Sequence, residues 1–217
     1  MKYPIGIQNF EQIISDGYVY VDKTALIHQL VTTGKIYFLS RPRRFGKSLL
    51  VSTLKSYFQG KKELFKGLAI DALEKDWHEY PVFHLDFNGS DFTQPGVLDS
   101  VIKDTILSWE KIYGKDPTYD DLGKRFVYIL AQAHQKYGRR AVVLIDEYDK
   151  PLLDVLDTGY TTTINDEKRL LEDHHRNILK GFYSVFKEAD EHLQFVLLTG
   201  VTKFSQVSVF SGFNQPA

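Results

Sequence analysis

Four short apolar runs, separated by longer amphipathic stretches, constrain the fold of this chain most. The runs cover residues 35–40, 81–87, 141–146 and 194–199, and they consist mainly of β-branched, aromatic and leucine side chains without strict alternation. Strands that are covered on both faces of a parallel sheet have this composition. We therefore expect four buried strands.

Helical patterns fill the intervals between these runs. Apolar residues recur at helical spacing over residues 48–58, 96–109, 119–137 and 167–189. Strands and helices in this order imply right-handed crossovers, and so an α/β fold with a parallel sheet and helices on both faces. A sheet of this kind usually continues after a fourth strand, but only a loop is indicated after Thr199. We therefore expect the domain to be truncated before its last strand.

Residues 1–34 form a leader that we expect to pack on a core of residues 35–217, as a single domain overall. The leader contains Tyr-Val-Asp-Lys-Thr at 20–24, followed by a short helical stretch that Asp22 or Thr24 could cap. The net charge is −1. The chain has no cysteine, and this excludes disulfides and thiolate metal sites. No signal peptide or membrane-spanning apolar run is present, and we expect a cytoplasmic protein.

The loop after the first expected strand carries a phosphate-binding pattern. Gly46-Lys47-Ser48 matches the end of a Walker A motif in the required context, between a buried strand and an amphipathic helix. A helix N-terminus favours anions, and glycine lets the backbone approach phosphate groups. Lys47 would contact the β- and γ-phosphates, and the Ser48 hydroxyl would be a ligand to Mg²⁺. The predicted nucleotide-binding residues are Arg41, Pro42, Arg43, Arg44, Phe45, Gly46, Lys47, Ser48 and Leu49.

The strict Walker A pattern fails in this loop. Arg41 stands where the first glycine is expected, and Arg44 stands where a second is often found. The guanidinium groups at 41, 43 and 44 could add phosphate contacts, contact a nucleic-acid backbone, or be solvated loop charges. A basic surface turn before a helix is the alternative interpretation of the whole loop.

The third apolar run ends in two acids, Asp146 and Glu147, and has the form of a Walker B motif. Acids at the carboxyl end of a parallel strand lie where ligands bind in open α/β sheets. Asp146 would hold Mg²⁺, usually through water, and Glu147 would orient or deprotonate the attacking water. An ordinary strand that ends in a polar turn is the alternative. Asp86, at the end of the second run, could lie behind the metal site, but we favour a turn cap with Asn88.

The fourth run ends at Thr199, with Thr202 and Lys203 behind it. In ATPases with a catalytic glutamate after the Walker B aspartate, this strand lies between the Walker A and Walker B strands. Its terminal polar residue can contact the γ-phosphate or the attacking water. Thr199 is therefore the candidate for a third catalytic residue beside Glu147 and Lys47, although a strand-end threonine in a turn is an equally good interpretation.

Four separated motifs, at residues 20–24, 41–49, 145–151 and 198–205, together resemble the bacterial AAA-ATPase-like family. In that family the ATPase domain is often followed by a PD-(D/E)XK nuclease-like domain. The resemblance covers residues 4–214 and implies that Arg-Pro-Arg-Arg-Phe-Gly-Lys-Ser is a normal phosphate loop of the family. It also implies that the ligands are ATP and Mg²⁺ and that ATP is hydrolysed, in a motor or a nucleotide switch. A nucleic-acid or protein partner would be contacted through a C-terminal domain that this sequence lacks.

Two other functions stay open. A P-loop phosphotransferase would share the loop, but it would need a nucleophile-binding lid with clustered arginines after the Walker B strand. Residues 157–166, which follow that strand, are rich in threonine and poor in arginine. A nucleic-acid or protein binding module with a nucleotide-regulated loop is supported only by the basic residues at 41–44 and 139–140.

Overall fold

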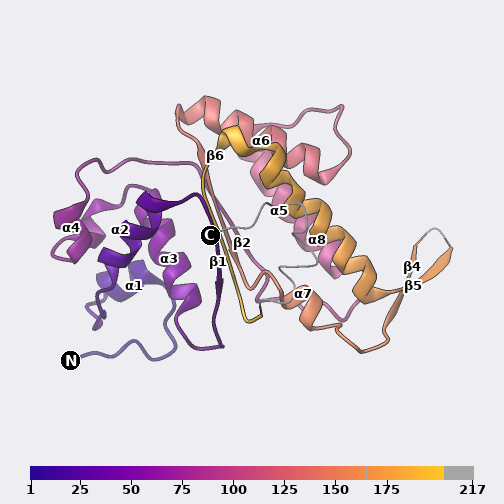
Figure 1. Cartoon of the computed structure of the whole chain (residues 1–217), viewed down its shortest axis with the longest axis horizontal. Helices are drawn as coiled ribbons and strands as arrows, with labels where there is room; N and C mark the ends of the chain where they lie inside the picture. Colours follow the sequence, from indigo (N-terminus) through magenta and orange to yellow (C-terminus); the bar gives the residue numbers. More distant parts are fainter. Residues whose placement is uncertain (165, 203–217) are drawn as a thin grey trace.

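A four-stranded parallel sheet forms the centre of the molecule, which is described here by a computed structural model covering residues 1–164 and 166–202 (Figure 1). The strands are β1 (Ile36–Ser40), β2 (Val82–Asp86), β3 (Ala141–Asp146) and β6 (Leu193–Gly200). Their order across the sheet is β1-β6-β3-β2, and all neighbours are parallel. The four predicted strands are thus confirmed, and β6 lies between β1 and β3 as expected.

Both faces of the sheet are covered, which explains the apolar runs. In β3 all six positions are buried. Val142 and Leu144 belong to one core cluster, and Val143 and Ile145 belong to the other. Because successive side chains of a strand point to opposite faces, a central strand between two helical layers needs apolar residues at every position.

The helices form two layers, one on each side of the sheet in Figure 1. One layer contains α1 (Phe10–Ser15), α2 (Thr24–Thr33), α3 (Lys47–Phe58) and α4 (Ala69–Leu73). The other contains α5 (Val97–Tyr113), α6 (Leu122–Tyr137) and α8 (Leu171–Glu188), and the short α7 (Lys150–Leu153) follows β3. Two 3₁₀ turns, η1 (Lys62–Phe65) and η2 (Asp190–His192), follow α3 and α8. The predicted α/β fold with helices on both faces is therefore confirmed. Within the described ranges, no helix is both long and apolar enough to cross a membrane.

The helix starting points follow local chemistry. The predicted helix over 119–137 begins only at Leu122, because the Asp121 side chain accepts a hydrogen bond from the Lys124 backbone N–H (2.9 Å) and so caps it. In α3, Val51, Leu54 and Phe58 recur at helical spacing and are buried against the sheet. The sequence pattern predicted this helix for the same reason.

The leader is joined to the core through the Tyr-Val-Asp-Lys-Thr motif. Asp22 accepts hydrogen bonds from the N–H groups of Thr24 (2.8 Å) and Ala69 (2.7 Å), and the buried Thr24 hydroxyl accepts one from Ile70 (3.0 Å). Partial burial opposes ionisation of Asp22. Hydrogen bonds from the Thr24 hydroxyl (2.7 Å) and from the Thr24 and Ala69 N–H groups outweigh it and lower the pKa of Asp22. The motif therefore caps the N-terminus of α4 as well as the start of α2.

One element was missed by the sequence patterns. Residues 161–170 form an antiparallel hairpin of β4 (Thr161–Ile164) and β5 (Glu167–Leu170), so the helix expected over 167–189 begins only at Leu171. All four residues of β5 are exposed, and they give no hydrophobic periodicity. The hairpin lies at the N-terminal end of α8, away from the sheet (Figure 1). The predicted loop over 207–217 falls outside the described residues.

Candidate functional site

The phosphate loop connects β1 to α3 at the carboxyl edge of the sheet. Gly46 has a φ of +77° and stands directly before the first helical residue, with no side chain capping the helix. The first N–H groups of α3 therefore have no side-chain acceptor at the cap and can receive an anion. Arg44 also has a left-handed backbone, with a φ of +67°, a conformation that favours glycine. Arg41, Pro42, Arg43, Arg44 and Phe45 are all exposed.

Lys47 points back over this loop. Its side chain is only 4% exposed, and its Nζ donates hydrogen bonds to the carbonyl groups of Arg41 (3.2 Å) and Pro42 (3.5 Å). The same Nζ lies 3.2 Å from Oε1 of Glu147, at the end of β3. The loop thus places one ammonium group next to the acidic turn. Ser48 and Leu49, in the first turn of α3, are half-buried.

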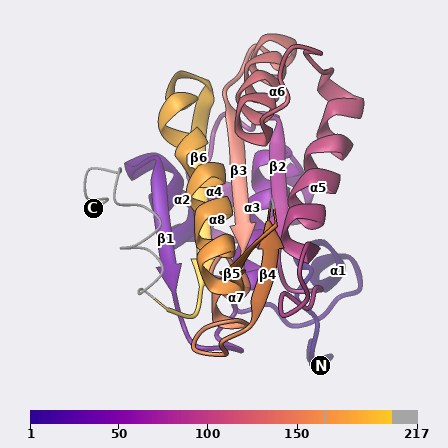
Figure 2. The same cartoon turned by 90° about the vertical axis from the view of Figure 1, so that its right-hand side faces the viewer.

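Thr199 lies next to the acids because its strand, β6, is paired with β3. The buried Thr199 hydroxyl donates a hydrogen bond to Oδ1 of the buried Asp146. That oxygen also accepts the Glu147 N–H (3.1 Å). Glu147 has a φ of +54°, a left-handed conformation that is uncommon for a side chain of this size. Three segments that are far apart in the sequence therefore converge at the carboxyl ends of the strands, and they carry Lys47, the pair Asp146 and Glu147, and Thr199 (Figure 2 shows the strands face on).

Asp86 lies beside Asp146 at the end of β2. Its Oδ1 accepts a hydrogen bond from the Asn88 N–H (2.8 Å), as expected for a cap of the following turn. Partial burial raises the pKa of Asp86, and the negative charge of Asp146 raises it further. Two neighbouring strand ends therefore concentrate negative charge at this edge of the sheet.

The donor set of the predicted metal ligands fits Mg²⁺. No group of three or more His, Cys, Asp or Glu residues that could hold a metal occurs in the described part of the chain. Mg²⁺ is commonly held by one or two protein oxygens together with phosphates and water, and the Ser48 hydroxyl and the Asp146 carboxylate are hard oxygen donors of this kind. The hydrogen bonds to Asp146 from the described residues engage Oδ1, which leaves Oδ2 for a cation.

An apolar cavity of about 580 Å³ lies beside the phosphate loop. The leader forms one wall with Tyr3, Val21 and Leu26, and the loop forms the other with Arg41 and Phe45. These apolar side chains are unusually exposed, at 63% for Leu26 and 71% for Phe45. An apolar cavity beside a helix N-terminus can take a flat apolar group next to an anion. The sequence pattern did not single out Tyr3, Val21 or Leu26 as cavity residues. In a short helix, the exposed Leu26 cannot be distinguished by pattern from the buried Ile27 next to it.

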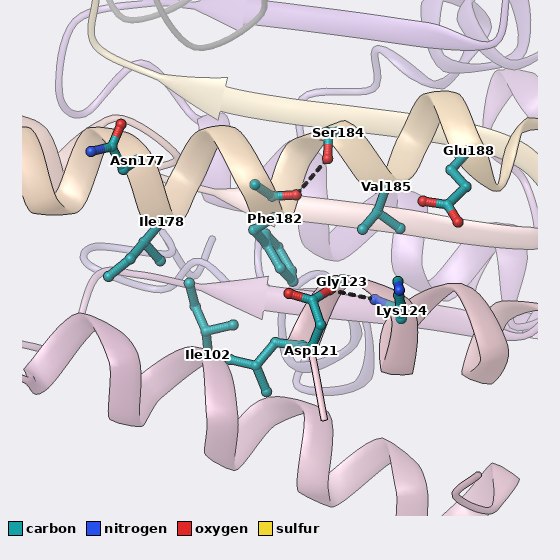
Figure 3. A pocket seen from close by; sticks show the side chains of 12 residues that line it. Ile102, Asp121, Gly123, Lys124, Asn177, Ile178, Phe182, Ser184, Val185 and Glu188 are labelled. Carbon is teal, nitrogen blue, oxygen red and sulfur yellow. Dashed lines mark hydrogen bonds between the residues drawn. The ribbon is translucent and has the colours of Figure 1, made fainter. Parts of the chain in front are cut away.

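A second cavity, of about 400 Å³, lies between α5, α6 and α8 (Figure 3). Ile178 and Phe182 on α8 point towards Ile102 on α5 across it. Gly123 allows α6 to come close to α8, since an added Cβ would lie 3.3 Å from Cγ2 of Val185. None of the predicted site residues lines this cavity, so it is separate from the converging edge of the sheet.

The fold and the converging residues define a P-loop NTPase-like domain. The chain belongs to a family described as "Predicted AAA-ATPase", whose model matches residues 4–210. It is also 43% identical, over 98% of its length, to a protein of Azotobacter chroococcum mcd 1 described as "Uncharacterized protein in vnfD 5'region". The chain spans 40% of the length of that relative. No solved structure matches the chain.

Proposed function

We propose that this domain binds ATP with Mg²⁺ at residues 41–49 and hydrolyses the γ-phosphate, as a motor or a nucleotide switch. One observation carries the proposal: Lys47 Nζ lies 3.2 Å from Glu147 Oε1, while the neighbouring Asp146 is hydrogen-bonded to Thr199. Three separate chain segments thus bring a cation, two acids and a hydroxyl to the N-terminus of α3. This is the set of groups that phosphoryl transfer to water needs.

In the proposed site the nucleotide phosphates lie on the first turn of α3 and take Lys47 away from Glu147. Lys47 then neutralises phosphate charge, and Glu147 accepts the proton of the attacking water. Ser48 and Asp146 would hold Mg²⁺, which supplies charge stabilisation on the phosphate oxygens. Thr199 stays at hydrogen-bond distance of Asp146 and is placed to contact the γ-phosphate or the water. The exposed guanidinium groups of the loop add phosphate contacts.

We place the nucleobase in the apolar cavity between the leader and the loop. Phe45 and the leader residues offer flat and aliphatic surfaces for a purine ring. The guanine-specific Asn-Lys-x-Asp pattern is absent from the sequence, which supports ATP over GTP.

The test is calorimetric titration of ATP and GTP with Mg²⁺, followed by a phosphate-release assay, on the parent, Lys47→Ala and Glu147→Gln. We expect Lys47→Ala to weaken ATP binding by about tenfold to hundredfold, because a charge-assisted hydrogen bond contributes about 1.5–3 kcal/mol. We expect Glu147→Gln to keep binding and to lose at least about a hundredfold in turnover, as for removal of a general base. Chelation of Mg²⁺ should stop hydrolysis.

Two exposed residues far from the site provide controls. Lys66→Ala and Glu188→Gln remove the same charges from the surface, so both should behave as the parent. A parent protein that binds neither nucleotide overturns the proposed function. Parental turnover in Glu147→Gln overturns the assignment of the base alone.

A further inference from the structure

Asp149 is a fully buried acid that the chemistry above does not use. Its Oδ2 accepts hydrogen bonds from the backbone N–H groups of Val201 (2.8 Å) and Thr202 (2.7 Å), and from the Thr202 hydroxyl (3.0 Å). We call residues 147–149 the post-β3 turn. We call residues 200–202, which begin with the last residue of β6, the post-β6 turn. One carboxylate oxygen of the post-β3 turn thus holds the post-β6 turn.

Gly200 makes this contact possible. A Cβ added at Gly200 would lie 2.6 Å from Oδ1 of Asp149 and 2.5 Å from Cε1 of Tyr148, closer than real Cβ contacts. The Tyr148 hydroxyl also donates a hydrogen bond to the Thr202 carbonyl (2.8 Å). A carboxylate, an aromatic ring and the absence of a side chain therefore fix the two turns against each other.

The post-β6 turn also contacts the phosphate loop. The Gly200 carbonyl accepts a hydrogen bond from the Arg41 N–H (3.1 Å), and the Ser40 hydroxyl donates one to the Val201 carbonyl (3.0 Å). On the other side, the Tyr148 N–H donates to the Thr199 carbonyl (2.9 Å). The peptide groups from 199 to 202 therefore lie between the phosphate loop and the catalytic acids, with hydrogen bonds to both.

Stability alone does not account for an acid at position 149. A buried carboxylate is costly unless donors surround it, and Oδ1 has no hydrogen-bond partner among the described residues although it is buried. What the charge provides is strong, well-directed bonds, since hydrogen bonds to an ionised acceptor are roughly twice as strong as neutral ones. Asp149 is thus suited to hold two backbone N–H groups at fixed positions.

We propose that Asp149 is a positioning residue that couples the phosphate loop to the catalytic acids through the post-β6 turn. The inference rests on the proposed ATPase function. Asp149 accepts the Val201 N–H, which belongs to the same peptide group as the Gly200 carbonyl to which Arg41 donates. The residue before it, Tyr148, donates its N–H to the carbonyl of Thr199, whose hydroxyl is bonded to Asp146. Within the described part of the chain, Asp149 makes no hydrogen bond or ion pair with Lys47, whose Nζ bonds to Arg41, Pro42 and Glu147. Its loss should therefore affect turnover more than nucleotide affinity.

The test compares Asp149→Asn and Gly200→Ala with the parent, by two readouts. The first is site-resolved amide hydrogen exchange, which needs no nucleotide. The second is a comparison of the change in kcat with the change in the calorimetric Kd for ATP with Mg²⁺. Asparagine has the shape of aspartate without its charge. Gly200→Ala keeps Asp149 but pushes its carboxylate away from position 200. If one variant fails to fold, the other still tests the proposal. Asp157→Asn is the control, because Asp157 is exposed and its left-handed φ of +56° suits asparagine.

We expect exchange to accelerate at Val201, Thr202 and Arg41 together in both variants, with other sheet amides unchanged. We also expect kcat to fall by about tenfold to hundredfold at an affinity within about twofold of the parent, as for a small misplacement of catalytic groups. Acceleration at 201 and 202 without a change at Arg41 would overturn the coupling, and so would parental kcat or an equal loss of affinity. If the parent binds no nucleotide, the proposed function fails, while the exchange readout still decides whether Asp149 links the two turns.

Discussion

Two non-glycine residues of the site, Arg44 and Glu147, hold left-handed backbone conformations. Such a conformation costs about 1–2 kcal/mol for a residue with a Cβ. At Glu147 the neighbouring hydrogen bonds impose it, since the Tyr148 N–H is tied to Thr199 and the Lys150 N–H to the Glu147 carbonyl (3.0 Å). The result directs the carboxylate to Lys47. The strained backbone of Glu147 is therefore caused by hydrogen bonds of the adjacent residues, and it brings the carboxylate close to Lys47.

At Arg44 the same strain gives a clean test of the guanidinium group. Arg44→Gly keeps the backbone conformation without a Cβ, so urea unfolding should show a stability equal to the parent or up to about 1 kcal/mol higher. We expect ATP affinity to fall by about tenfold, because an arginine–phosphate hydrogen bond is lost. Calorimetry measures this change. Arg140→Ala, an exposed arginine before β3, should bind as the parent. Parental affinity in Arg44→Gly would make Arg44 a solvated loop charge.

At the scale of elements, α8 contacts the segment that follows Asp146 and Glu147. The His175 ring Nδ1 lies 2.9 Å from the Pro151 carbonyl of α7, and the Tyr183 hydroxyl donates to the Tyr148 carbonyl (3.2 Å). Both side chains are buried. The helical layer that contains α8 is therefore bonded to the residues after Glu147 through two polar contacts.

His175 makes this support dependent on pH. Burial lowers its pKa, the nearby His174 lowers it further, and the hydrogen bond to Pro151 opposes the shift only in part. Because the folded state then binds a proton less readily than the unfolded state, whose histidine pKa is about 6.5, stability is full above that pH. It is lost as the pH falls towards the folded-state value.

We therefore expect the free energy of unfolding to fall between pH 7.5 and pH 5, and to fall less in His175→Asn. Asparagine keeps a donor for the Pro151 carbonyl and does not titrate in this range. Urea unfolding at several pH values measures the difference. Part of the fall should remain, since burial also lowers the pKa of His84 on β2. Parallel pH profiles for the parent and His175→Asn would remove His175 as the source.

The elements also show what the sequence could and could not predict. The strands and α3 were predictable because two-sided burial imposes an apolar pattern on them. The hairpin was not predictable, since β5 is exposed and has no apolar pattern. In the sequence, Leu170 reads as part of the apolar stripe of α8 together with Leu171, but Leu170 is exposed and only Leu171 is buried. At the site, the loop and the acids are local motifs and could be predicted. The contact between Asp149 and the post-β6 turn depends on the pairing of β3 with β6 and could not.

At the scale of the whole molecule, the leader packs on the helix that follows the 41–46 loop. Phe10 is buried against Phe65, with ring centroids 4.8 Å apart, and its N–H donates to the Ser52 hydroxyl of α3 (2.9 Å). Ser52 follows the phosphate-binding turn on the same helix, so the leader is anchored directly to the helix that is proposed to bind phosphate. A ligand in the adjoining cavity would then contact leader and core together, and its binding would stabilise both against unfolding.

The proposed position of the nucleobase can be tested with two ligands. Leu26 is exposed in the cavity wall, so Leu26→Ala should weaken ATP binding by about threefold to tenfold, as expected when about 1 kcal/mol of apolar burial is lost. Inorganic tripolyphosphate, which has no base, should bind Leu26→Ala and the parent equally in calorimetry. Leu73→Ala is the matched control, because Leu73 is 46% exposed on α4 but does not line the cavity. Equal losses for ATP and tripolyphosphate would mean that Leu26 acts on the phosphate loop, and no loss for either would place the base outside the cavity.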